Sequence, residues 1–247
     1  MTEMIGDPVG EVRKHFHEEL DDLRAEIVRA AALVTEAIPR GTEVLLDGDL
    51  DGAQALIESD DELDDLSLLI EEHAVRILTL QQPVASDLRA LVTALKMNGE
   101  VERSGDLVTN IAKGCRRIYG VTFNPRCRGL IEQMSEEAAR LYRFAIDAYV
   151  DGNASLAGAL DDMDDRLDSL NKDFVKAIFE AHNAGEIDLQ VAVQLALVGR
   201  YYERIGDHAV NIGEMVQFMV TGWMPEHTGA ARIRARRASE EPAQDGE

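Results

Sequence analysis

The chain has 247 residues, of which 45% are hydrophobic, so it is long enough to bury a substantial core. Only 5% of the residues are aromatic, which favours helices over sheets because strands prefer β-branched and aromatic residues. The formal net charge of −22 argues against direct binding to nucleic acid or to an anionic membrane surface, since like charges repel.

Breaker residues divide the chain into six long segments, none of which shows the alternation of a half-buried strand. The breaks fall at 39–41, 82–83, 120–125, 151–153, 183–185 and 222–225. The sequence therefore predicts an all-α fold with helices over 9–38, 42–81, 84–118, 126–150, 153–182 and 186–221. Asp47-Gly48 has the composition of a turn, although it lies inside the second of these helices.

The chain carries no recognisable targeting or membrane-spanning segment. Its first residues include Glu3 and Asp7 and lack an apolar run, unlike a signal peptide. No segment approaches the roughly 18 consecutive apolar residues that a transmembrane helix needs. Cys115 and Cys127 have no CxxC spacing and are expected to be reduced. These features predict a cytoplasmic protein.

A five-residue motif occurs twice, as ERSGD at 102–106 and as ERIGD at 203–207, 101 residues later. A second pair of segments repeats one helix earlier, where Asp60 and Asp64 match Asp164 and Asp168 at a spacing of 104 residues. A repeat at nearly constant spacing indicates an internal duplication. The sequence therefore predicts two tandem three-helix bundles, 9–119 and 125–222.

The repeated acids lie four residues apart, so each pair shares one face of a helix. Like charges at this spacing destabilise a helix by roughly 0.2–0.5 kcal/mol, and a mid-helix glycine costs about 1 kcal/mol relative to alanine. A bound cation would remove the repulsion, and a glycine would allow a helix or ligand to approach closely. The candidate ligands are Glu102, Asp106, Glu203, Asp207, Asp60, Asp64, Asp164 and Asp168.

An alternative is that the acids form a solvated face paired with arginines, for which Arg103 and Arg204 are available. The helix face that carries Glu102 and Asp106 continues an apolar stripe through Leu88 and Leu95. A second stripe runs through Met97, Val101 and Val108, and the sequence leaves open which of the two faces the core. His208 follows Asp207 but has no counterpart in the first copy, which argues against a repeated histidine ligand.

Motifs for catalysis are absent from the sequence. It has no phosphate-binding GxxxxGK[ST] loop, no GxSxG or HExxH, and no Glu-x-x-His pair of the kind that di-iron enzymes use. The sequence therefore favours a binding or regulatory protein that is not an enzyme. A metal-binding helical protein with storage or hydrolytic activity, and a helical scaffold without metal, remain alternatives.

Several segments together resemble the PhoU family over residues 11–221: RKHFHEEL at 13–20, LQQPVASDLR at 80–89, and ERIGDHAVNI at 203–212 with its earlier copy. The resemblance implies two three-helix bundles and a negative regulator of phosphate uptake and phosphate-starvation signalling. Separately from the resemblance, a helical bundle of this size is expected to form a homodimer with a second copy of the chain. The partners that the resemblance implies are the ATPase subunit of a phosphate ABC transporter and a phosphate-sensing histidine kinase. Such partners would recruit the protein to the inner face of the membrane.

The resemblance also implies that the ExxxD motifs bind divalent or multinuclear metal, with iron, manganese, magnesium or zinc as candidates. It assigns the eight acids above as ligands, with Asp61 and Asp165 as adjacent substitutes. The segment 226–247 has no counterpart in the family pattern. It contains Arg232, Arg234, Arg236 and Arg237 with few large apolar residues, so the sequence predicts a disordered tail.

Overall fold

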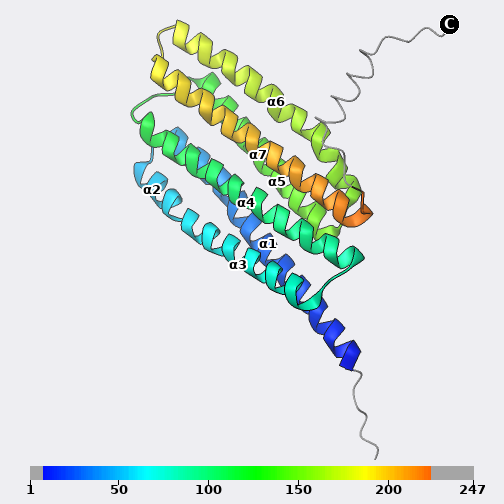
Figure 1. Cartoon of the computed structure of the whole chain (residues 1–247). Coiled ribbons are helices and arrows are strands. Elements are labelled where there is room, and N and C mark those ends of the chain that lie inside the picture. Colours follow the sequence, from blue (N-terminus) through cyan, green and yellow to red (C-terminus); the bar gives the residue numbers. More distant parts are fainter. Residues whose placement is uncertain (1–7, 224–247) are drawn as a thin grey trace, which may run out of the picture.

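The computed structural model describes residues 8–223, and over this range the chain folds into seven α-helices without strands (Figure 1). The helices are α1 Pro8–Asp47, α2 Leu50–Glu58, α3 Asp60–Gln81, α4 Ala85–Arg117, α5 Pro125–Asp151, α6 Ala154–Asn183 and α7 Leu189–Thr221. The all-α prediction is confirmed. The predicted tail at 226–247 lies outside the described residues.

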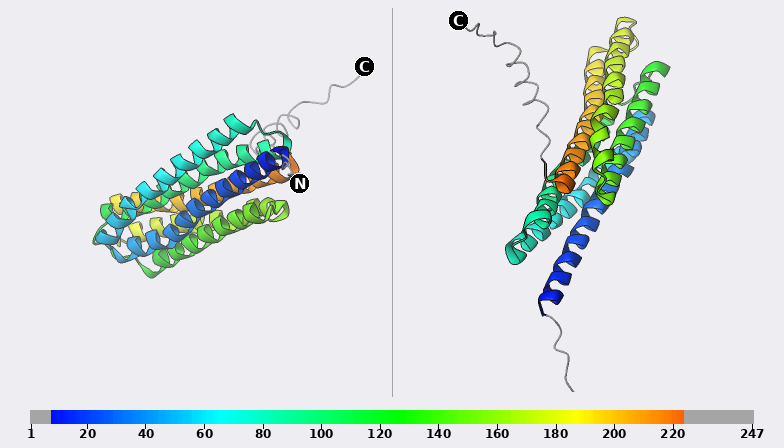
Figure 2. Two further views of the ribbon diagram at one scale, coloured as in Figure 1. Left: turned by 90° about the horizontal axis from the view of Figure 1, so that it is seen from below. Right: turned by 90° about the vertical axis from the view of Figure 1, so that its right-hand side faces the viewer.

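The helices form two tandem bundles that lie lengthwise against each other (Figure 2). The first bundle contains α1 to α4 and the second contains α5 to α7. The bundles meet where α4 packs on α7 and α1 packs on α5. The predicted pair of three-helix units is therefore present, with α2 as an additional short helix in the first.

The prediction that the first helix ends at residue 38 is wrong, because α1 continues through Pro39 to Asp47. A proline inside a helix removes one backbone hydrogen bond and costs about 3 kcal/mol. Pro39 itself is exposed, whereas Ile38, Thr42 and Leu45 on the same helix are buried. Burying one large aliphatic side chain gains about 1.5–3 kcal/mol, so the packing of this stretch outweighs the proline.

The prediction of one helix over 42–81 is also wrong, since α2 and α3 are separate helices. Gly48 adopts a φ of +67°, which reverses the chain and confirms the turn expected at Asp47-Gly48. Asp49 then caps α2 by accepting a hydrogen bond from the Gly52 backbone nitrogen at 2.9 Å. The remaining helices end within a few residues of the predicted breaks.

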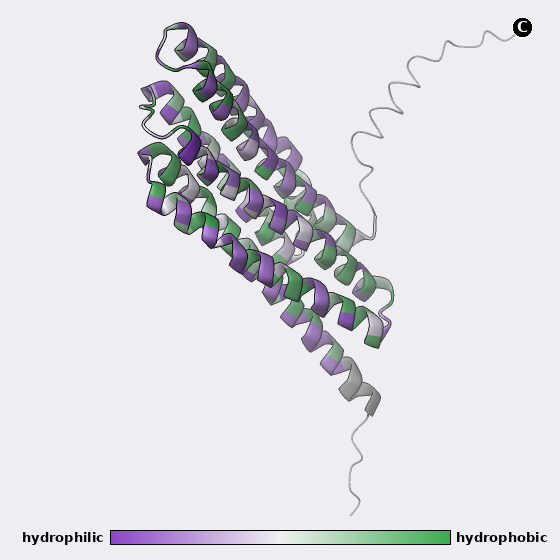
Figure 3. Ribbon diagram, turned by 60° about the vertical axis from the view of Figure 1, so that its left-hand side comes forward, coloured by the Kyte–Doolittle hydropathy of each residue, from purple (hydrophilic) through white to green (hydrophobic). Residues whose placement is uncertain are grey.

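The core stripe of α4 runs through Met97, Val101 and Val108, each at most 1% exposed. The stripe that continues through Glu102 instead borders the surface, with Leu88 at 38% exposure. On α7 the corresponding acids likewise lie beside the core stripe. Figure 3 shows that every helix carries both hydrophilic and hydrophobic residues, as helices with one buried face do.

Three buried hydroxyl groups connect the two bundles. Thr42 Oγ1 on α1 lies 2.7 Å from Ser135 Oγ on α5 and 2.7 Å from the Tyr202 hydroxyl on α7. Thr42 Oγ1 also lies 2.9 Å from the Ile38 carbonyl oxygen, to which it donates. Both cysteines are buried and free, in agreement with the sequence. Within residues 8–223 no helix is long and apolar enough to cross a bilayer.

Candidate metal sites

The first cluster of acids forms where the start of α3 packs against the middle of α4. Burial raises the pKa of Asp60, and the charges of Asp64 and Asp106 raise it further, against the lowering effects of a hydrogen bond with Thr109 and of the Lys113 charge. Burial likewise raises the pKa of Glu102, with Asp106 as the next contributor. The four predicted acids of the first repeat therefore lie close enough to repel one another.

The second cluster repeats this arrangement between α6 and α7. Burial is the main cause that raises the pKa of Asp164 to about 7. The charges of Asp207, Asp168, Glu203 and Asp161 add to the effect in that order. The structure thus places all eight predicted acids in two groups of four.

Each ExxxD motif contains a glycine that lets the two helices of its cluster approach. A Cβ atom at Gly206 would lie within 3.0 Å of Asp164 Oδ1 and 2.7 Å from Leu167 Cδ2. A Cβ at Gly105 would likewise lie within 3.0 Å of Leu63 Cδ2. Leu63 matches Leu167 in the repeat, so both glycines serve the same close contact. The element that packs against each glycine is another helix. The sequence had left open whether a helix or a ligand approaches there.

The donor set fits a hard cation in its chemistry, because carboxylate oxygens are the ligands that Mg²⁺, Mn²⁺ and Ca²⁺ prefer. Asp164 Oδ1 and Asn171 Oδ1 are buried without a hydrogen-bond partner, and Asn171 Nδ2 lies 3.5 Å from Glu203 Oε2. In the described part of the chain, however, no three His, Cys, Asp or Glu side chains converge tightly enough to form a ready-made metal site. A cation would have to draw the carboxylates together.

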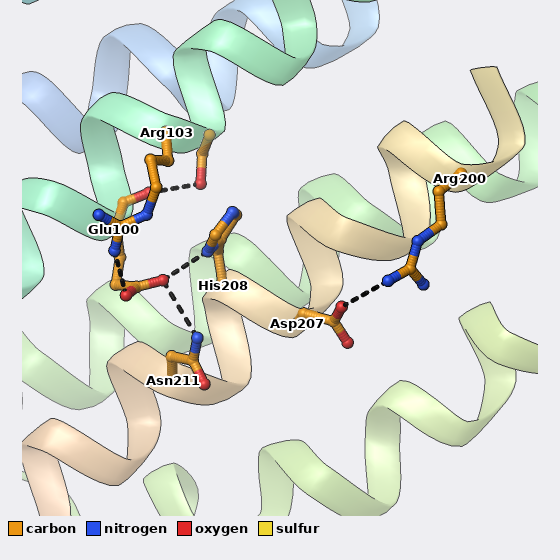
Figure 4. Close-up of polar contacts among 7 residues, drawn as sticks. Glu100, Arg103, Arg200, Asp207, His208 and Asn211 are labelled. Atoms are coloured by element: carbon orange, nitrogen blue, oxygen red, sulfur yellow. Dashed lines mark hydrogen bonds and ion pairs between the residues drawn. The ribbon is translucent and has the colours of Figure 1, made fainter. Parts of the chain in front are cut away.

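The two clusters differ in their basic neighbours. Arg200 pairs with Glu203, and its Nη2 lies 3.9 Å from Asp207 Oδ2 (Figure 4). Lys172 lies 3.8 Å from Asp168. Among the side chains of residues 14–223, none forms an ion pair within 4.0 Å with any of the four acids of the first cluster. The pairing with arginine that the sequence offered as an alternative therefore exists in one repeat only.

The arginine in this pairing is neither of the two that the sequence suggested. Arg103 pairs with Glu100 instead, and Arg204 is exposed. Arg200 could have been found, because it precedes Glu203 by one helical turn.

A buried polar cluster beside the second site was not predicted. Glu100 on α4 is 7% exposed and accepts hydrogen bonds from His208 and, at 3.1 Å, from Asn211 Nδ2. Figure 4 shows His208 pointing across to Glu100, while its neighbour Asp207 points toward Arg200. Burial alone would raise the pKa of Glu100, but these hydrogen bonds and the charges of His208 and Arg103 lower it.

We expect Asp164→Asn to raise the stability of the metal-free protein at pH 8, because it removes a partly buried charge among other acids. Between pH 3.8 and about 7, the Asp164 carboxyl binds fewer protons in the unfolded chain than in the folded one. The cost of Asp164 to the stability of the fold therefore grows as pH rises through that range. After allowance for partial exposure, the gain is about 1 kcal/mol.

Urea unfolding in EDTA at pH 8 and at pH 4 measures this effect, and the gain should be smaller at pH 4. Asp165→Asn is the matched control, since Asp165 is exposed on the same helix. A gain that is equal at the two pH values would contradict the expectation.

Comparison with known proteins supports a single family. The family model described as the PhoU domain matches residues 15–114 and 131–216. A Mycobacterium tuberculosis protein named phosphate-specific transport system accessory protein PhoU homolog 1 is 32% identical over 215 residues, covering 87% of this chain and 96% of that protein. A Zymomonas mobilis protein named phosphate-specific transport system accessory protein PhoU homolog is 31% identical over 233 residues, covering 94% of this chain and 98% of that protein.

Solved structures agree with the fold. The crystal structure of PhoU from Pseudomonas aeruginosa superposes with a TM-score of 0.77 at 29% identity, covering 84% of this chain and all of that one. The phosphate transport system regulatory protein PhoU from Streptococcus pneumoniae gives a TM-score of 0.79 at 23% identity, covering 85% and 99% respectively. With both repeats matched by the family model, the chain belongs to the PhoU family.

Proposed function

We propose that this protein is a cytoplasmic negative regulator of phosphate uptake and of phosphate-starvation signalling. In this role it links the ATPase subunit of a phosphate ABC transporter to a phosphate-sensing histidine kinase. The observation that carries the proposal is the family match across both repeats, together with relatives named as accessory proteins of phosphate-specific transport. It acts by binding partners and is not an enzyme, in keeping with the lack of catalytic motifs in the sequence.

The carboxylate clusters are proposed as metal sites. Asp60, Asp64, Glu102 and Asp106 would hold a cation between α3 and α4, and the matching acids Asp164, Asp168, Glu203 and Asp207 would do so between α6 and α7. A divalent cation supplies positive charge that offsets the repulsion among the acids. The acids and their glycines then hold the two helices of each pair together.

The charge of the protein favours basic partner surfaces. A net charge of −22 speeds association with a positive surface and disfavours acidic ones. A second copy of the chain is proposed as a further partner, because a helical bundle of this size is expected to dimerise.

Deletion of the gene in its own organism tests the regulatory proposal. We expect phosphate-starvation genes, such as the one for alkaline phosphatase, to be expressed in phosphate-rich medium at the level of starved cells. A plasmid copy should restore repression, which serves as the control. Normal repression in a clean deletion strain would rule out the role. Capture of the tagged protein at high and low phosphate, with immunodetection of the transporter ATPase and the kinase, tests the partners.

A further inference from the structure

Four helices form a layer on one side of the molecule. Figure 1 shows α6, α7, α4 and α3 side by side in this order, and α1 and α5 pack against one side of the layer. The other side of the layer is its outer face. Because α4 and α7 have helix neighbours on every other side, their exposed side chains lie on this outer face.

The two repeats are related by a half-turn within this layer. Thr93 Oγ1 on α4 donates a hydrogen bond to the Met215 carbonyl oxygen on α7 at 3.3 Å. The residue of α7 that matches Thr93 is Gln194, whose side-chain oxygen accepts a hydrogen bond from Arg117 of α4 at 3.5 Å. Each helix thus contacts the late part of the other with its own early part, so α4 and α7 run antiparallel. A half-turn about an axis between them exchanges the two repeats.

Large apolar side chains are exposed at matching positions of the two repeats. Val75 on α3 matches Phe179 on α6, and Leu88 on α4 matches Leu189 on α7. All four are exposed, Phe179 at 65% and Leu189 at 67%. Further exposed apolar residues on the same helices are Leu68 and Leu78 in the first repeat and Val193 and Leu197 in the second.

The helix register brings the members of each apolar patch together. Asn98 Nδ2 on α4 donates to the Ser67 carbonyl oxygen on α3 at 2.9 Å, so the end of α3 that carries Leu78 comes level with Leu88. In the second repeat, Gly199 on α7 packs against Phe174 on α6, so the exposed residues that follow on α6 come level with the start of α7. Apolar side chains that gather on a surface in this way mark an interaction site.

Acidic side chains accompany each apolar patch at the same spacing. Asp64 precedes Val75 by eleven residues, about three helical turns, so the two share one side of α3. Their counterparts Asp168 and Phe179 have the same spacing on α6. Glu102 likewise follows the exposed leucine of α4 by fourteen residues, about four turns. Each half of the outer face is therefore apolar at one end and acidic at the other.

We propose that the outer face binds a two-fold symmetric partner protein, so that one copy of this chain binds two partner subunits. Each half of the face takes one amphipathic helix, which carries apolar residues at one end and lysine or arginine about three turns away. This inference rests on the proposed function, because it names the surface through which the protein binds a partner.

Charge complementarity selects this occupant. The acids of the outer face repel the same face of a second copy, and the net charge of −22 disfavours an anionic membrane. Burial of the apolar patches supplies affinity, while the acids fix the direction of the bound helix. A two-fold partner makes the same contacts with both halves, which a single asymmetric segment cannot do.

The repeat offers matched substitutions. Val75→Gln/Leu88→Gln removes apolar side chains from the first half, and Phe179→Gln/Leu189→Gln removes their counterparts from the second. Glutamine suits a helix and all four positions are exposed, so both variants should fold. Val150→Gln is the control, because Val150 is an exposed apolar residue on α5 and lies outside the layer.

Calorimetric titration and light scattering of the full-length protein test the inference, with the purified transporter ATPase subunit and the cytoplasmic part of the histidine kinase as probes. We expect wild type to bind at least one probe at one chain per two probe subunits, and more weakly as NaCl rises from about 0.1 to about 0.5 M. Each double variant should weaken this binding at least about tenfold and to a similar extent, since a partner held at both halves loses by damage to either. Val150→Gln should match wild type, and circular dichroism confirms that each variant is folded.

Wild-type affinity in both folded double variants would overturn the inference and leave the proposed partners intact. A loss confined to one half, or a complex with one probe subunit per chain, would do the same. Double variants that keep the probe but dissociate a dimer of this chain would show that a second copy occupies the face, which also overturns the inference. If wild type binds neither probe, the inference and the partners of the proposed function fail together, and the regulatory role is still judged by the deletion strain.

Discussion

Replacing His208 by alanine is expected to lower the free energy of unfolding by about 3 kcal/mol at pH 7, among the largest effects of any single substitution in this protein. His208 and Glu100 are both buried and face each other across the contact between α4 and α7. Loss of the imidazole leaves Glu100 buried with only Asn211 and Arg103 as partners, and it also leaves a cavity. Urea denaturation followed by circular dichroism measures the loss.

Two further measurements separate the charge effect from the cavity. The double variant Glu100→Leu/His208→Leu should recover most of the lost stability, because it replaces a buried pair by apolar side chains. The first repeat already has Leu107 at the position that matches His208. Because the pKa of Glu100 is lowered in the folded state, its contribution to stability is present above its usual pKa of 4.5 and is lost as pH falls below it.

The advantage of wild type over His208→Ala should therefore shrink in acid. His15→Ala, at an exposed histidine, is the control. An equal, small loss from both alanine variants would show that the buried pair contributes nothing to the contact between the bundles.

Replacing Gly206 by alanine is expected to destabilise the protein by about 2 kcal/mol, although alanine favours helices over glycine by about 1 kcal/mol. The added methyl group would collide with Asp164 and with Leu167, which is fully buried and cannot easily move. The helices α6 and α7 would have to separate, and the carboxylates of the second cluster with them. The overpacking cost should therefore exceed the gain in helix propensity.

The control is Gly129→Ala on α5, where no atom lies within 4 Å of the new Cβ. This substitution should raise stability by up to about 1 kcal/mol, since only the helix propensity changes. Thermal and urea unfolding of both variants measure the sign of the change in the free energy of unfolding, which should be negative for Gly206→Ala and positive for Gly129→Ala. Stabilisation by both would mean that Gly206 is not held against α6.

The sequence predicted those features of the fold that depend on local residues. The breaks at Gln82-Pro83, Gly152 and Gly222 were found because proline and glycine force or favour the local backbone, and all three breaks lie just beyond a helix end. The prediction that a helix ends at Pro39 was wrong because the helix is stabilised there by the burial of Ile38 and Leu45. That burial depends on packing against other helices. Local propensity cannot report such packing.

The candidate site was predicted in part for a similar reason. Repetition revealed the eight acids and the glycines beside them, because both copies retain the same residues at the same spacing. Arg200 escaped notice because it does not repeat, although its replacement by Gly99 in the other copy was visible in the sequence. Glu100 and His208 are 108 residues apart and match Tyr201 and Leu107, so neither the spacing nor the repeat pointed to their contact.

The hydroxyl contacts of Thr42 limit how the two bundles can move. A shift by one helical turn, about 5.4 Å, would separate Thr42 from Ser135 and Tyr202 and leave buried hydroxyls unpaired at about 1–3 kcal/mol each. A hinge motion that opens the bundles at their ends would keep Thr42 in contact with Ser135 and Tyr202, and it would therefore avoid this cost. Any conformational change that transmits a signal between the repeats is therefore expected to be a hinge motion, and not a shear.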